Sequence, residues 1–351
     1  MKAIIHIGRQ KTGTTSLQSF LKVNALELES QDFRYSLVGQ KTITQREFAI
    51  SAKVASGRPI PKDNTKLFYG LKTNEDAKNL ADRFNNEFEQ EMSGWNEKCF
   101  LLSSEYLNAW FDQTDQIKEL DAYFSRFFSE RGYVIYLRRQ EDHVLSSYSQ
   151  RLKSSKVITL DEYIQQSHKF NYNRLVTNWA NAVGRENLAV RLFEKDNMLN
   201  GDLIEDYCHL VGIDLANLKR PAHKNEALSS VAMDVLYQLN KTLPKFKPDG
   251  TMNEARKGVV TQLMNLDETT EKKRLTSSQL DLIRSANKQS NEKLRAEFFP
   301  ELAELFPSRP DQVFASADRS HEEKVSTLMK KIEAQLNPRP SRLKSLLKFR
   351  M

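Results

Sequence analysis

The sequence predicts an α/β fold in which a parallel sheet lies between two layers of helices, followed by a helical C-terminal region. Three observations support this prediction. Apolar runs of strand length alternate with amphipathic segments of helix length over residues 1–225. The first of these runs enters a turn with two glycines and then immediately a helix. From residue 226 onward the pattern is helical, with proline-containing breaks at 244–250 and 300–310.

The first strand and the loop after it are the most informative stretch. Residues 4–7 are apolar apart from His6, and the turn between Gly8 and Gly13 leads into an amphipathic helix. Glycines let such a loop bring several backbone N–H groups to one point, and the helix N-terminus adds unpaired donors and partial positive charge. We therefore expect an anion to bind at this loop, held by Thr12, Gly13, Thr14, Thr15 and Ser16.

The loop departs from the common nucleotide-binding pattern, in which a lysine follows the second glycine. Thr14 stands at that position, and the lysine comes early, as Lys11. From there a lysine reaches the far, transferring end of a phospho-anhydride. The alternative is an ordinary strand-loop-helix turn without a ligand, but a buried strand, two placed glycines and a lysine-threonine cluster rarely coincide by accident.

Further strands are expected at 99–103, 133–137 and 187–193, with a weaker one at 34–38. Glu105 follows the strand at 99–103, at the kind of position where chemistry collects in open parallel sheets. The alternative for Glu105 is a helix N-terminal acid stabilised by the helix dipole.

A second candidate anion site follows the strand at 133–137. Arg138 directly follows that strand, and Ser146 comes eight residues later. Arginine supplies the planar fork that suits phosphate. The two side chains converge on one anion if the chain between them is a loop and a first helical turn.

These motifs resemble those of sulfotransferases that use 3′-phosphoadenosine 5′-phosphosulfate (PAPS). Residues 11–15 match the Lys-x-Gly-Thr-Thr loop that binds the 5′-phosphosulfate in that family. Arg138, Asp142 and Ser146 fall in register on its Arg-x-x-x-[Asp/Glu]-x-x-x-Ser motif for the 3′-phosphate. The style of these motifs is closest to heparan-sulfate-type and bacterial members. Gln140 is a departure, because the family often has proline there.

The resemblance implies an enzyme that moves a sulfuryl group from PAPS to a hydroxyl or amine acceptor without a metal. Lys11 would stabilise the leaving oxygen, and Glu105 would be the general base, as in carbohydrate-type members; a glycan is therefore the expected acceptor. Arg220 and Lys224 would belong to a basic loop that closes over the nucleotide. Two alternatives remain: a catalytically inactive PAPS-fold binding protein, and a P-loop nucleotide kinase, which would need lysine at position 14 and a carboxylate for magnesium.

Composition limits the other functional classes. The net charge of the 351 residues is +7, but residues 338–351 hold five basic and no acidic side chains. The rest is nearly balanced, so no nucleic-acid partner is expected. Cys99 and Cys208 have neither disulfide-framework nor zinc spacing. No apolar run has the length of a signal segment or membrane span, which favours a cytoplasmic protein.

Three parts are expected along the chain. Residues 1–225 form the PAPS-binding core with a helical insertion at about 44–96, residues 226–337 form a helical extension or cap, and residues 338–351 form a basic tail. Within the tail, residues 341–351 place leucines on one helical face among basic side chains, which suits peripheral contact with the inner membrane surface. A solvated C-terminus, or a helix docked on the body, is the alternative.

Overall fold

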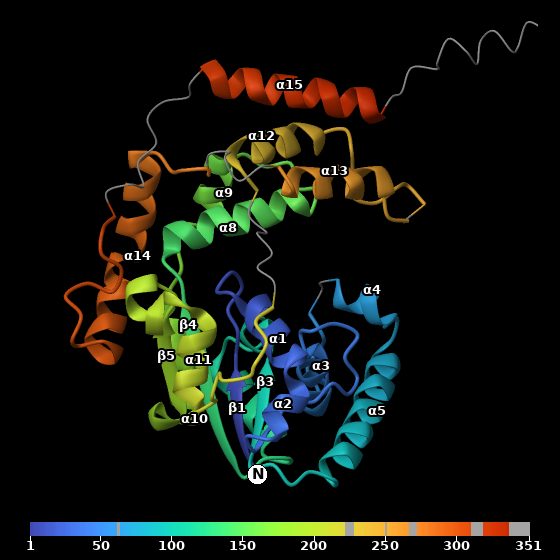
Figure 1. Ribbon diagram of the computed structural model, residues 1–351, viewed down its shortest axis with the longest axis vertical. Coiled ribbons are helices and arrows are strands. Elements are labelled where there is room, and N and C mark those ends of the chain that lie inside the picture. Colours follow the sequence, from blue (N-terminus) through green and yellow to red (C-terminus); the bar gives the residue numbers. More distant parts are fainter. Residues whose placement is uncertain (62–63, 222–227, 250, 267–271, 310–318, 337–351) are drawn as a thin grey trace, which may run out of the picture. The chain divides into compact units, whose positions relative to one another are not determined.

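The structure is a computed structural model that describes residues 1–61, 64–221, 228–249, 251–266, 272–309 and 319–336 (Figure 1). Lys224 and the basic tail lie outside these residues. The chain forms two compact units. Unit 1 combines residues 1–139, 171–223 and 288–306, and unit 2 combines residues 140–170, 224–287 and 307–351. The domain division expected from the sequence stays a prediction.

Unit 1 is built on a parallel sheet with the strand order β2-β3-β1-β4-β5. The strands are β1 (Lys2–His6), β2 (Phe33–Arg34), β3 (Cys99–Ser103), β4 (Glu130–Leu137) and β5 (Leu188–Leu192). This arrangement confirms the α/β prediction. The chain goes to one side of β1 for β2 and β3, and to the other side for β4 and β5. The carboxyl end of β1 is therefore a switch point, the place where open α/β sheets bind ligands.

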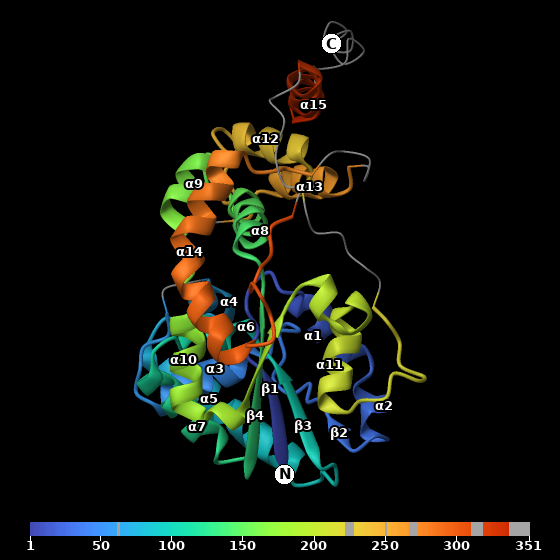
Figure 2. The same cartoon turned by 90° about the vertical axis from the view of Figure 1, so that its left-hand side faces the viewer.

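Helices cover both faces of the sheet (Figure 2). One face carries α1 (Thr14–Val23), α2 (Ala25–Glu29) and α11 (Leu203–Val211). The other face carries α3 (Arg46–Ala55), α5 (Asn74–Met92), α7 (Thr114–Phe124) and α10 (Tyr172–Val183). Unit 1 also contains two short helices, α4 (Thr65–Tyr69) and α6 (Glu105–Trp110).

Alternate residues of the strands supply two cores, as the pleat of a strand requires. Ile4 and Leu101 pack under α1 and α11 with Phe20 and Tyr207. On the opposite face an aromatic cluster joins α3 and α5 to the sheet, and the ring centroids of Phe48 and Phe100 lie 6.0 Å apart. Both cores hold β1 in the middle of the unit, so the loop that follows it starts from a rigid strand.

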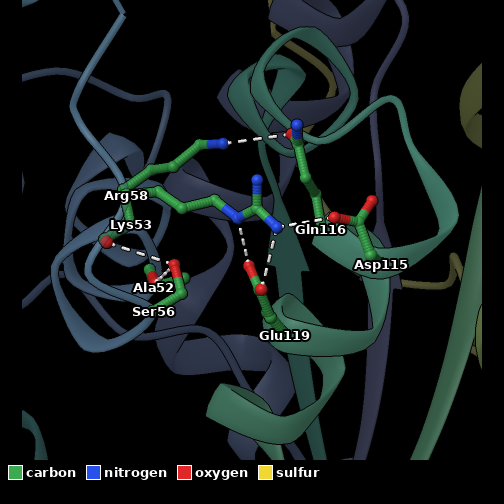
Figure 3. A network of polar contacts seen from close by, with 7 residues as sticks. All are labelled: Ala52, Lys53, Ser56, Arg58, Asp115, Gln116 and Glu119. Atoms are coloured by element: carbon green, nitrogen blue, oxygen red, sulfur yellow. Dashed lines mark hydrogen bonds and ion pairs between the residues drawn. The ribbon is translucent and has the colours of Figure 1, made fainter.

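A polar network also connects α3 to α7 (Figure 3). Arg58, just after α3, donates to Glu119 at 2.5 and 2.9 Å and to Asp115 at 2.6 Å. The buried Lys53 ammonium donates to the Gln116 side chain at 3.2 Å, and burial lowers the pKa of Lys53. These contacts fix the insertion to the body of unit 1.

Unit 2 has a helical core of its own. Its helices are α8 (Gln140–Lys153), α9 (Leu160–Ser167), α12 (Ser230–Leu239), α13 (Glu254–Met264), the first part of α14 (Ser277–Phe298) and α15 (Arg319–Leu336). Tyr148, Leu236 and Ile332 are among the buried residues at its centre. The buried Arg256 donates to the carbonyl groups of Leu152, Lys153 and Leu243. The helical pattern after residue 226 is thus confirmed.

Candidate functional site

The loop after β1 turns sharply before it enters α1. Lys11 and Gly13 have φ angles of 70° and 74°, in the left-handed region. The amide of Leu17 donates to the Gly13 carbonyl at 3.1 Å, as the helical pattern requires. The amides of Thr14, Thr15 and Ser16 precede it in the first turn, where an α-helix offers its N–H groups no carbonyl partner. They form the donor group expected of an anion site.

The loop is braced from inside by two of the predicted site residues. The hydroxyl groups of Thr12 and Thr14 donate to the Arg9 carbonyl at 2.6 and 3.0 Å, and both side chains are buried. Thr15 and Ser16, by contrast, are exposed at the start of α1. The hydroxyl groups of Thr12 and Thr14 therefore stabilise the loop itself, and those of Thr15 and Ser16 are exposed to solvent.

Both glycines are required by close packing. A Cβ at Gly13 would lie 2.4 Å from Cδ2 of Leu203. A Cβ at Gly8 would lie 2.9 Å from Cγ2 of Thr14 and 3.1 Å from the backbone nitrogen of Glu105. Gly8 thus brings the loop against the backbone of the candidate base.

Glu105 lies beside this loop because β3 pairs with β1. The Ser104 amide donates to the His6 carbonyl at 3.1 Å, and Glu105 then begins α6. The side-chain amide of Gln18, a buried residue of α1, donates to Oε2 of Glu105 at 3.0 Å and to the Ser103 carbonyl at 3.1 Å. The helix that starts at the anion loop therefore also orients the Glu105 carboxylate.

Arg138 approaches the loop from the opposite side, after β4. Its Nη1 donates to the Lys11 carbonyl at 2.8 Å, and its guanidinium carbon lies 5.7 Å from the centroid of the Phe193 ring. The Tyr172 hydroxyl donates to the Arg138 carbonyl at 2.7 Å. The structure thus brings the Lys11 loop, Glu105 and Arg138 together at the carboxyl ends of three adjacent strands.

None of these contacts of the described residues joins the remaining predicted site residues to this group. Ser146 lies on α8 in unit 2. The loop expected between Arg138 and Ser146 is short, because α8 already begins at Gln140 and Ser146 belongs to its second turn. The exposed Arg220 pairs with two acids of α11 and its cap, Asp202 at 2.7 Å and Glu205 at 2.6 Å. The roles of Ser146, Arg220 and Lys224 at a nucleotide stay predictions.

His6 is a core residue at the end of β1. Its ring is fully buried, and Nδ1 lies 2.8 Å from the Ser103 hydroxyl. Nε2 has no hydrogen-bond partner among the described residues. Burial lowers the pKa of His6 to about 3, so the imidazole is neutral near pH 7.

His6 should give the fold a measurable sensitivity to acid. Because its pKa is about 3 when folded and near 6.5 when unfolded, the unfolded chain binds the proton first. The stabilisation is full above pH 6.5 and falls as the pH drops towards 3. At about pH 5 the loss is roughly 2 kcal/mol. We expect urea unfolding of His6→Asn to lack this decline between pH 7 and pH 5; an equal decline in both proteins would exclude His6 as its cause.

Sequence reasoning missed two residues that orient the site. Gln18 was a visible signal, because a polar side chain stands at a core position of α1 between Leu17 and Phe20. Tyr172 gave no local signal, although its ring lies 4.9 Å from the guanidinium carbon of Arg9 and its hydroxyl binds Arg138. Its role depends on α10 packing beside β4, which no short motif encodes.

The described residues contain neither a metal-ligand cluster nor a helix that could span a membrane. None of them form a group of three or more His, Cys, Asp or Glu side chains that could hold a metal ion. Within the same part of the chain, no helix has both the length and the apolar character needed to cross a membrane.

The chain is similar to known proteins at low sequence identity. No protein-family model matches the chain. An uncharacterised protein of Archaeoglobus fulgidus is 27% identical over 170 residues, which are 47% of this chain and 45% of that protein. The chain therefore matches less than half of that relative's length. The crystal structure of a sulfotransferase from Alicyclobacillus acidocaldarius aligns with 84% of this chain and 94% of its own, at 14% identity and a TM-score of 0.43. Function has to be inferred from the residues of this chain.

Proposed function

We propose that this protein is a sulfotransferase that moves the sulfuryl group of PAPS to a hydroxyl or amine acceptor, with a carbohydrate as the preferred acceptor class. One observation carries the proposal. The carboxyl ends of β3, β1 and β4 bring a carboxylate, an anion loop with an early lysine, and an arginine bound to that loop into one site. These are the groups that a reaction between an anionic donor and a protonated acceptor needs.

The donor lies along the loop in this proposal. The amides at the start of α1, with the exposed Thr15 and Ser16 hydroxyls, bind the 5′-phosphate. Arg138 binds the 3′-phosphate through its guanidinium fork. Ser146 is assigned to the same phosphate from the sequence motif alone.

The chemistry is an in-line displacement at sulfur. The acceptor oxygen or nitrogen forms a new bond to sulfur, while the bond between sulfur and the bridging oxygen of the donor breaks. Glu105 takes the acceptor proton, and adenosine 3′,5′-bisphosphate leaves with the bonding electron pair on the bridging oxygen. Lys11 stabilises the negative charge that develops there. Positioning and charge stabilisation supply most of the catalysis in such loose transition states.

The loop geometry disfavours a P-loop kinase. Thr14 occupies the lysine position, and its hydroxyl donates to the Arg9 carbonyl inside the loop. The residue that follows β4 is Arg138 and not a carboxylate for magnesium. An inactive PAPS-binding protein is disfavoured for a different reason, since such a protein would tolerate the loss of Lys11 or Glu105, and the chain has both.

A transfer assay tests the proposal. Sulfur-labelled PAPS is offered with polysaccharides, lipid-linked sugars and phenols, in a buffer containing a metal chelator. We expect label to enter one acceptor class, with one adenosine 3′,5′-bisphosphate released for each transfer. Tight PAPS binding without transfer to any class would favour the inactive binding protein instead.

Arg138→Ala should weaken donor binding specifically. The variant loses a charge-assisted contact worth about 1.5–3 kcal/mol, which corresponds to roughly 10- to 150-fold in Kd. Calorimetry with adenosine 3′,5′-bisphosphate measures the change. Adenosine 5′-phosphate is the control ligand, because it lacks the group that Arg138 is proposed to bind. An equal loss for both nucleotides would assign Arg138 to the loop structure alone.

A further inference from the structure

Arg46, the first residue of α3, is a buried cation that forms no ion pair with any described acidic residue. Only 9% of the residue is exposed. Its Nη1 donates to the Thr65 hydroxyl at 3.2 Å, and its Nε has no hydrogen-bond partner among the described residues. No carboxylate oxygen of the described residues lies within 4.0 Å of a guanidinium nitrogen of Arg46, which is the distance limit for an ion pair. A guanidinium removed from water without a counter-charge is strongly unfavourable unless something else compensates it.

The surroundings of Arg46 are aromatic. Its guanidinium carbon lies 4.0 Å from the centroid of the Tyr106 ring, 5.4 Å from that of Phe68 and 5.8 Å from that of Tyr69. Such contacts replace part of the lost hydration but do not neutralise the charge. Phe68 is 46% exposed, so the aromatic cluster extends to the surface.

The neighbouring acid has other partners. Oε1 of Glu47 accepts from the Tyr69 hydroxyl at 2.7 Å and from the Lys41 amide at 3.3 Å. Burial raises the pKa of Glu47, which favours its neutral form. Glu47 therefore hydrogen-bonds to Tyr69 and to the Lys41 backbone and forms no ion pair with Arg46, although the nearby Arg46 charge offsets part of the rise in its pKa.

Two contacts join Arg46 and the residue before it to residues on either side of Glu105 in the chain. The Ser103 amide donates to Oε1 of Gln45, the residue before Arg46, at 3.0 Å. On the other side of Glu105, the Tyr106 ring lies against the Arg46 guanidinium. The Tyr106 ring that contacts Arg46 follows β3, which neighbours β1 on one side, whereas Arg138 follows β4, which neighbours β1 on the other side. The proposed donor position, along the loop and at Arg138, leaves the opposite side of Glu105 for the acceptor. An acceptor bound there would be close to Arg46.

We propose that Arg46 and the rings of Tyr106, Tyr69 and Phe68 form an acceptor subsite that binds an oxyanion carried by a saccharide. The oxyanion is the carboxylate of a hexuronate or the phosphate of a sugar phosphate, both of which fit the guanidinium fork. The inference rests on the proposed function, because it takes Glu105 as the base that faces the acceptor. It assigns the insertion at 44–96 a role in acceptor selection.

Matched acceptors test the subsite by calorimetry in the presence of saturating adenosine 3′,5′-bisphosphate. One pair is a hexuronate-containing oligosaccharide and the same oligosaccharide with its carboxyl groups reduced to alcohols. The second pair is a sugar phosphate and its dephosphorylated form. We expect wild-type protein to bind the anionic member of one pair at least tenfold more tightly, and the pair that shows the preference identifies the anion. Equal binding within both pairs would overturn the proposal.

Arg46→Met separates recognition from folding. The variant should lose the preference for the anionic member and keep its affinity for the neutral one and for the bisphosphate. Its Tm should be unchanged or higher, because a buried unpaired charge has been removed. A lower Tm with the preference intact would make Arg46 a structural residue. Arg46→Lys, which keeps the charge without the fork, should retain part of the preference.

Arg58→Met is the matched control, because Arg58 follows the same helix but is paired with Glu119 and Asp115 (Figure 3). It should keep the acceptor preference. An equal loss in both variants would indicate a general charge effect and overturn the subsite. Bisphosphate binding separates the two proposals: if wild-type protein does not bind it, the sulfotransferase proposal fails, whereas binding without anion preference defeats only the subsite.

Discussion

Replacing Glu105 with glutamine should lower turnover by about 10²- to 10⁴-fold, the range expected when a general base is lost. The glutamine side chain has the same size as glutamate, and its amide oxygen can still accept the hydrogen bond from Gln18. It cannot act as a base that takes the proton from the acceptor hydroxyl or amine. Single-turnover transfer from labelled PAPS measures the chemical step, and calorimetry should show donor affinity largely unchanged.

The control for this variant is Gln18→Met. It removes the hydrogen bond that orients Glu105 but leaves the base in place, so the loss of turnover should be smaller than for Glu105→Gln. Near-normal turnover of Glu105→Gln on the true acceptor would show that another residue is the base. His143 would be tested next, because it lies within the Arg138–Ser146 motif of the sequence.

Lys11→Ala should lower turnover by about 10²- to 10³-fold, the scale of one transition-state donor. The backbone carbonyl that binds Arg138 remains, and alanine at φ 70° carries the same left-handed strain as lysine. The loss should therefore appear in kcat and less in the affinity for adenosine 3′,5′-bisphosphate. Gln10→Ala, at the exposed neighbouring position, is the control. A loss confined to donor affinity would make Lys11 a binding residue only.

Elements with strong local signals were predicted well from the sequence. The strand Cys99–Ser103 has the expected bounds. The sequence also predicts a helix over residues 203–211, stopped by Gly212, and the helix Leu203–Val211 has those bounds. The helix is delimited by its own residues, because Asp202 caps its first amides and Gly212 ends it at a φ of 86°. The amphipathic pattern of residues 115–129 predicts a helix over that whole range, but the helix ends at Phe124, since β4 begins at Glu130 and the chain must turn first. The strand expected at 34–38 is only Phe33–Arg34, because it pairs with β3 alone at the edge of the sheet.

The candidate site was predictable where short motifs encode it. Lys11, Glu105 and Arg138 each follow a strand, and the parallel sheet brings those strand ends together. The contacts that orient them join residues far apart in the chain, such as the bond from Gln18 to Glu105, and no spacing rule reveals them. Arg46 was read as part of a polar helical insertion, because only the folded chain shows its burial and its ring contacts.

The central claim is that the site recognises a 3′-phosphorylated adenosine nucleotide without a metal. Calorimetry of the wild-type protein with adenosine 3′,5′-bisphosphate and with ATP, each in EDTA and then in Mg²⁺, tests it most directly. We predict that the bisphosphate binds at least about tenfold more tightly than ATP, a difference of about 1.4 kcal/mol, and that Mg²⁺ does not change its affinity. Equal affinity for the two nucleotides, or bisphosphate binding that requires Mg²⁺, would contradict the claim.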